Sequence, residues 1–169
     1  MSTHPETHTV PGAPASETTA GAQRDDMAWL LRQFAADVPG VTHAVLLSRD
    51  GLCLLDSDVD KDWADELSAA ISGVASLAAN ITGPSHKKRA ARQVIIERDD
   101  CLFFVQSAGR SAFFDNHFGE RGEVDTVLAV IATTDADAGA VGFEMGRLVN
   151  KFDPYMVIPV RVGTKGEVR

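Results

Sequence analysis

The sequence predicts an α/β fold of the α+β kind, in which helices cover both faces of an antiparallel five-stranded sheet. Two patterns support this class. Helical and extended segments follow one another in the order α-β-β-α-β-β-β-α, and short turn sequences join neighbouring extended segments, as in antiparallel pairs. The chain has 169 residues and 44% hydrophobic content, which suits about one compact domain with a hydrophobic core.

The N-terminal segment 1–24 is rich in Thr, Pro, Ala, Glu and Gly and has few large apolar residues. It can bury too little apolar surface to offset the entropy of ordering, so we expect a disordered tail over 1–24. Order is expected from Asp25, in a helix that stops at Pro39-Gly40. Its apolar face comprises Met27, Leu30, Leu31, Phe34 and Val38.

The first two strands are expected on either side of Asp50-Gly51. The runs 41–48 and 52–55 are apolar, and Asp-Gly between two apolar runs is a strong hairpin signal. An acidic run over 56–62 follows, and acidic groups favour the positive end of the next helix.

That next helix, predicted over 62–82, has no charged side chain from Leu67 onward. Large apolar residues recur along one stripe at Trp63, Leu67, Ile71, Val74, Leu77, Ala78 and Ile81. The rest of the surface is small and uncharged, with Ala64, Ser68, Ser72, Ala75, Ser76 and Ala79. Small side chains let another backbone come close, and monomers usually avoid exposing such a surface. We therefore expect this small stripe to be covered by another subunit or partner.

The same patterns predict strands at 93–98, 101–106 and 125–132 and a final helix at 135–152. The inward residues of the final helix are Val141, Met145, Leu148, Val149 and Phe152. The segment 109–124 is long for a hairpin loop. The predicted division of the chain is a tail over 1–24, a domain over 25–152 and a C-terminal extension over 153–169.

Charge and composition exclude several classes of function. The net charge of −8 argues against nucleic-acid binding. No apolar run approaches the roughly 18 residues of a membrane-spanning helix, so direct membrane insertion is not expected. With no evident signal peptide, and Cys53 and Cys101 expected as free thiols, we predict a cytoplasmic protein. Recruitment to the membrane through a partner is kept as an option.

No sequence motif supports catalysis or metal binding. There is no phosphate-binding GxxxxGK[ST] loop, GxGxxG, GxSxG or HExxH. The run Asp56-x-Asp58-x-Asp60 begins like a calcium loop, but Lys61 and Leu67 stand where Gly and Glu are needed. We therefore predict no catalytic residue, no metal and no cofactor, and a protein that is not an enzyme.

Four segments of the sequence resemble a known family. They are Val38-Pro-Gly-Val-Thr-His-Ala-Val45, Leu47-Ser-Arg-Asp-Gly-Leu52, the Ala/Ser-rich helix and Gly142-Phe-Glu-Met145. These segments resemble bacterial, conservon-associated members of the roadblock family, which is named after a dynein light chain. The resemblance covers about residues 25–152. It implies the roadblock/profilin-like fold and a homodimer that regulates or scaffolds a Ras-like small GTPase in bacterial signalling. A sensor-kinase-like protein is an implied further partner. In the family, two sheets join edge to edge through the strand after the central helix, here Arg92–Arg98.

The candidate interface therefore combines the small stripe with a basic loop and this strand. Its residues are Ala64, Ser68, Ser72, Ala75, Ser76, Ala79, Arg89, Arg92, Val94 and Ile96. The cluster Lys87, Lys88, Arg89 and Arg92 has three interpretations: a solvated loop, a contact for an acidic partner, or a weak contact for nucleic acid or anionic lipid. Two alternative functions stay open. One is a pure scaffold without effect on GTP hydrolysis, and the other is a small-ligand sensor, which would need a cavity with convergent polar groups.

Overall fold

The computed structural model describes residues 15–112, 114 and 123–156. In order, the elements are α1 (Ala15–Asp37), β1 (Val41–Ser48), β2 (Cys53–Asp56), α2 (Lys61–Asn80), β3 (Val94–Glu97), β4 (Leu102–Ser111), β5 (Val124–Ala132), α3 (Ala138–Lys151) and the 3-10 turn η1 (Asp153–Tyr155). The predicted order α-β-β-α-β-β-β-α is confirmed. Predictions for residues 1–14, 113, 115–122 and 157–169 lie outside the described residues.

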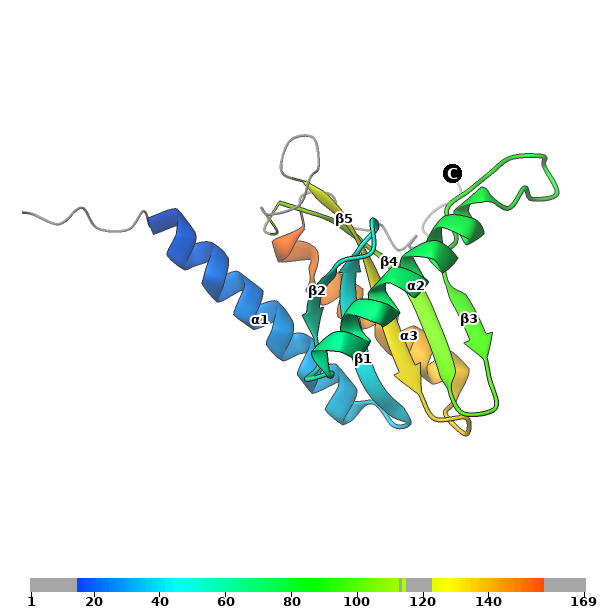
Figure 1. Cartoon of the computed structure of the whole chain (residues 1–169), viewed down its shortest axis with the longest axis horizontal. Coiled ribbons are helices and arrows are strands. Elements are labelled where there is room, and N and C mark those ends of the chain that lie inside the picture. Colours follow the sequence, from blue (N-terminus) through cyan, green and yellow to red (C-terminus); the bar gives the residue numbers. More distant parts are fainter. Residues whose placement is uncertain (1–14, 113, 115–122, 157–169) are drawn as a thin grey trace, which may run out of the picture.

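The sheet has the strand order β2-β1-β5-β4-β3, and its strands pair antiparallel throughout. Figure 1 shows α2 crossing one face of the sheet, with α1 and α3 on the other. The β1–β2 hairpin turns at the predicted Asp50-Gly51, where Gly51 has φ +98°, a value that glycine adopts without strain. This topology leaves β2 and β3 at the two edges.

The sheet divides the hydrophobic core into two layers, one beneath α1 and α3 and the other beneath α2. On the α1–α3 side, Phe104, Leu128 and Phe152 belong to one buried cluster. On the α2 side, Val105, Leu67 and Ile71 belong to the other. Side chains alternate along a strand, so β4 feeds both clusters from successive residues. All but one residue of β5 are buried, as expected for a central strand covered on both faces.

The first helix begins earlier than predicted. It starts at Ala15, so the expectation of disorder is wrong for residues 15–24. Ala and Glu in this stretch are good helix formers, and Arg24 fixes it to the domain. The guanidinium of Arg24 donates from Nη2 to the carbonyl oxygen of Leu54 at 3.0 Å and lies 5.7 Å from the ring centroid of Phe114. Of the predicted apolar face, Leu30 is half-buried and the other four residues are buried.

Replacing Arg24 with Ala should lower the free energy of unfolding by about 1 kcal/mol, since a charged hydrogen bond and a cation–π contact are both lost. Urea denaturation would measure the change. Arg32→Ala is the matched control, because Arg32 is exposed on the same helix and has no ion-pair partner among the described residues. Equal losses in the two variants would mean that the contacts of Arg24 contribute nothing specific.

Strand β4 also extends beyond its prediction, to Ser111 instead of residue 106. The ladder with β5 shifts register between Ser107 and Gly109, and Gly109 adopts φ +97° there. Glycine allows this irregularity because it has no Cβ to clash. Part of the segment 109–124 that was predicted to be loop is therefore strand.

Candidate interaction surface

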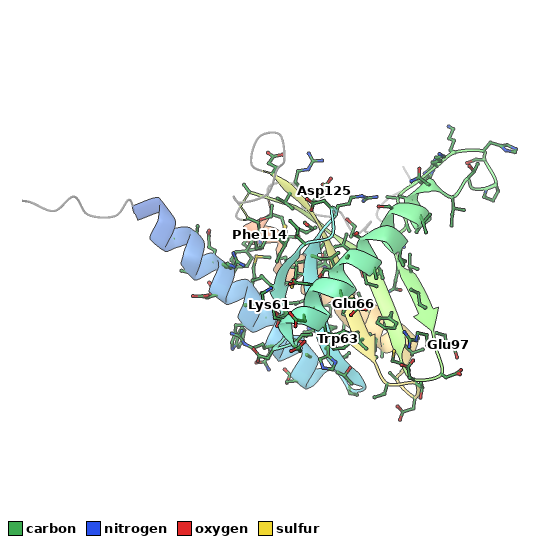
Figure 2. All side chains as sticks on the ribbon, in the orientation of Figure 1. Lys61, Trp63, Glu66, Glu97, Phe114 and Asp125 are labelled. Atoms are coloured by element: carbon green, nitrogen blue, oxygen red, sulfur yellow. The ribbon has the colours of Figure 1, made fainter. Side chains whose placement is uncertain are left out.

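The helix α2 is anchored to the sheet at its N-terminal end. The carboxylate of Asp60 accepts a hydrogen bond from the backbone N–H of Trp63 at 3.1 Å, which caps the helix. The Trp63 ring meets His43 of β1 edge to face, with centroids 5.0 Å apart. Leu67 and Ile71 are buried beneath the helix. Lys61, Trp63 and Glu66 all lie near this end (Figure 2), and the charged residues of α2 are confined to it.

The small stripe of α2 serves the chain's own packing more than predicted. Ala64 and Ser68 are buried against the sheet, and the Ser68 hydroxyl donates to the carbonyl oxygen of Ala64 at 2.7 Å. A Cβ built on Gly51 would lie 3.0 Å from Oγ of Ser72, so the small side chain admits the β1–β2 turn. The assignment of Ala64 and Ser68 to a partner interface is thus wrong, because the sheet already covers them.

Four other predicted residues remain accessible. Ser72, Ala75, Ser76 and Ala79 are half-buried at the margin of the helix–sheet contact. Ala75 also packs against the core cluster on this side. Their part in a partner contact stays a prediction.

The outward side of α2 is apolar, because the predicted stripe of large residues is buried only in part. Leu77 is 72% exposed and Ile81 is 70% exposed. Ala70 and Gly73 are also exposed. The residues 70, 73, 77 and 81 follow one another at steps of three or four, so they lie on one side of the helix, with Ile81 as its C-cap. We call Ala70, Gly73, Leu77 and Ile81 the α2 outer face. It has no charged residue, and two large aliphatic side chains project from it.

The edge strand β3 lies beside this helix on the sheet. Its residues Val94–Glu97 pair with Leu102–Val105 of β4, and in the described part of the chain no strand pairs with its other edge. Val94 and Ile96 are half-buried, whereas Ile95 on the other face of the sheet is exposed. An open edge offers unpaired backbone donors and acceptors, which can pair with a strand of another chain.

The basic loop follows α2 and projects away from the sheet (Figure 1). Its shape is fixed by an isolated bridge between Thr82 and Lys88, and Nζ of Lys88 lies 3.4 Å from the Asn80 side-chain oxygen. Arg89 and Arg92 are exposed, and neither has an ion-pair partner within the described ranges. Their charges are therefore available to an acidic partner.

Both cysteines of the chain lie within the described residues, and neither is an activated nucleophile. Burial raises the pKa of the Cys53 thiol, and the nearby Asp56 carboxylate raises it further. Burial and Asp100 likewise raise the pKa of Cys101. Both cysteines are free, and a protonated thiol is a weak nucleophile. Within the described ranges, His, Cys, Asp and Glu side chains form no cluster of three that could hold a metal. No helix there has the length and apolar character for crossing a membrane.

The comparisons with known proteins agree with this architecture. The model of the Roadblock/LC7 domain matches residues 27–114, from α1 through β4. The chain belongs to the Roadblock/LC7 family. The resemblance noted in the sequence is therefore confirmed at the level of the family.

Solved structures extend the match over most of this Roadblock/LC7 protein. A Roadblock/LC7 domain from Streptomyces avermitilis is 37% identical, with 75% of this chain and 94% of that chain covered and a TM-score of 0.62. A structure of MglB with a tetrameric arrangement is 15% identical, with 79% and 90% covered and a TM-score of 0.60. The gliding protein MglB from Thermus thermophilus is 16% identical, with 76% and 87% covered and a TM-score of 0.59. A comparison with curated proteins gives no significant match.

Proposed function

We propose that this Roadblock/LC7 protein is a non-enzymatic homodimeric regulator of a Ras-like small GTPase in a bacterial signalling system. The observation that carries the proposal is the uncharged α2 outer face beside the open edge of β3. Large exposed aliphatic side chains next to an unpaired strand are unfavourable in a monomer and typical of an interface. The roadblock resemblance supplies the GTPase as the class of partner.

In the proposed homodimer, the β3 edges of two copies pair, so that one sheet continues across both protomers. The α2 outer faces of the two copies then lie on the same side of that joined sheet, because α2 crosses one face only. Leu77 and Ile81 of the two chains can then bury one another. Val94 and Ile96, half-buried toward the α2 side, would complete the seam.

The GTPase would contact the surface that joins the two α2 helices with the basic loops. Arg89 and Arg92 provide exposed cations there, which favours an acidic partner surface through faster association. A bacterial conservon-type setting, with a sensor-kinase-like protein as a further partner, is part of the proposal. So is a cytoplasmic location, with membrane recruitment through a partner.

Two mechanisms of activation can be distinguished. A regulator can order the switch loops around the GTPase's own catalytic groups, or it can insert an arginine that stabilises the transition state. We favour loop ordering. In that mechanism Arg89 and Arg92 lie at the edge of the GTPase contact and do not enter the GTPase's active site.

Single-turnover GTP hydrolysis by a Ras-like GTPase that co-purifies from the native host tests the proposal. The protein should accelerate hydrolysis, and Arg89→Ala and Arg92→Ala should each keep most of that acceleration. An inserted arginine supplies about a thousandfold or more, so a loss of this size in either variant would contradict loop ordering. Binding without any acceleration would replace the regulator with the pure scaffold.

A further inference from the structure

A cavity lies on the opposite side of the sheet from α2, between α3, the start of β3 and the middle of β4. Its volume is about 630 Å³. The side chains that give it chemical character are Arg92, Gln93, Gln106, Phe143, Arg147 and Asn150. The size falls within the roughly 300–1,000 Å³ that small-molecule sites usually occupy.

Two glycines of α3 keep this cavity open. A Cβ built on Gly142 would lie 2.9 Å from Nε2 of Gln93, so the bare backbone makes room for that amide. A Cβ on Gly146 would meet no atom within 4 Å, although Gly146 lines the cavity. Any side chain at residue 146 would therefore extend into free space and reduce the volume available to a ligand.

The cavity is cationic in a chain whose net charge is −8. Arg92 and Arg147 are the charged residues among those that line it. Arg147 also pairs with Glu144, one turn earlier on α3, at 3.1 Å, so a carboxylate balances part of its charge. Arg92 has no ion-pair partner among the described residues. Guanidinium groups bind phosphate and carboxylate groups through paired hydrogen bonds.

An aromatic ring and several amides complete the lining. Phe143 is 66% exposed, so the face of its ring is accessible to a planar group that stacks on it. The amides of Gln93, Gln106 and Asn150 can each donate and accept hydrogen bonds, as the edge of a heterocyclic base requires.

We propose that this cavity binds a mononucleotide, with its phosphate on Arg92 and Arg147 and its base against Phe143 and the amides. This assignment goes beyond the proposed function, since α3 and the α2 outer face lie on opposite sides of the sheet (Figure 1). Arg92, between the basic loop and β3, is the residue that the two proposals share. It would make the protein responsive to a ligand as well as to a GTPase.

The test is calorimetric titration of the full-length protein with AMP, GMP, CMP and UMP. At least one should bind saturably, and Gly146→Leu should weaken binding at least about tenfold by filling the cavity. Gly21→Leu is the matched control, because Gly21 lies in α1 and its Cβ would also meet nothing within 4 Å. Leu replaces Gly favourably in a helix at both positions, so both variants should fold.

A second pair of variants tests the charge. Arg147→Gln should weaken binding at least about tenfold through loss of a charged contact. Arg98→Gln is its control, since Arg98 is 56% exposed and pairs with Asp100, much as the 58% exposed Arg147 pairs with Glu144. Adenosine and inorganic phosphate should each bind more weakly than AMP. The proposal is overturned if none of the four nucleotides binds, if Gly146→Leu binds as well as Gly21→Leu, or if phosphate alone matches AMP.

Discussion

Replacing Leu77 with Arg should convert the proposed homodimer into a monomer at micromolar concentration. Leu77 is 72% exposed, so the substitution leaves the core intact and the variant should fold. In the dimer it would force a charge into an apolar contact, which costs several kcal/mol by order of magnitude. A cost of about 3 kcal/mol weakens self-association roughly a hundredfold. Light scattering would report the change as a halved mass.

Ala36→Arg provides the control for this result. Ala36 is exposed on α1, on the other side of the sheet, and its substitution should leave the dimer unchanged. A dimeric Leu77→Arg variant would show that the α2 outer face is not the self-association surface. A monomeric wild-type protein would remove the homodimer altogether.

Replacing Phe104 with Ala should cost about 3–5 kcal/mol of folding free energy, because it leaves a large void in the core. Phe104 is fully buried in the cluster shared by α1, α3 and the sheet. Domains are commonly stable by only about 5–15 kcal/mol, so the variant should melt roughly 10 °C lower. Thermal and urea denaturation would measure the loss.

The adjacent Phe103 provides a matched comparison for the core substitution. It points to the other face of the sheet and is half-buried, with the Arg98 guanidinium 5.6 Å from its ring centroid. Phe103→Ala should cost clearly less folding free energy, about 1–2 kcal/mol, because the half-buried Phe103 ring buries less apolar surface on folding than Phe104 does. Equal losses at the two positions would contradict the two-layer core.

The order of elements could be predicted because local signals were strong. Asp50-Gly51 marked one hairpin, and the stripe that includes Val141, Met145 and Phe152 marked the buried side of α3. The start of α1 was missed since the segment 15–24 has little apolar surface. Its order depends on Arg24 reaching Leu54, a contact with a residue 30 positions away.

The candidate site was predicted only in part. The absence of charge along α2 singled out this helix, but periodicity alone does not say which uncharged side meets the sheet. Ala64 and Ser68 proved to be buried, while Leu77 and Ile81 face outward. The edge position of β3 came from the family resemblance, since strand order is set by pairing between distant segments. The cavity could not be foreseen because it joins Gln93 and Gly146, which only the fold brings together.

The most direct test of the central claim is the affinity of the protein for a co-purifying Ras-like GTPase in its two nucleotide states. A regulator must contact the switch loops, whose conformation differs between those states. We predict that affinity for the form loaded with a non-hydrolysable GTP analogue differs at least about tenfold from affinity for the GDP form. Leu77→Arg should reduce binding if the GTPase requires both protomers. Equal affinity for the two states, or no binding to either, would contradict the proposed regulator.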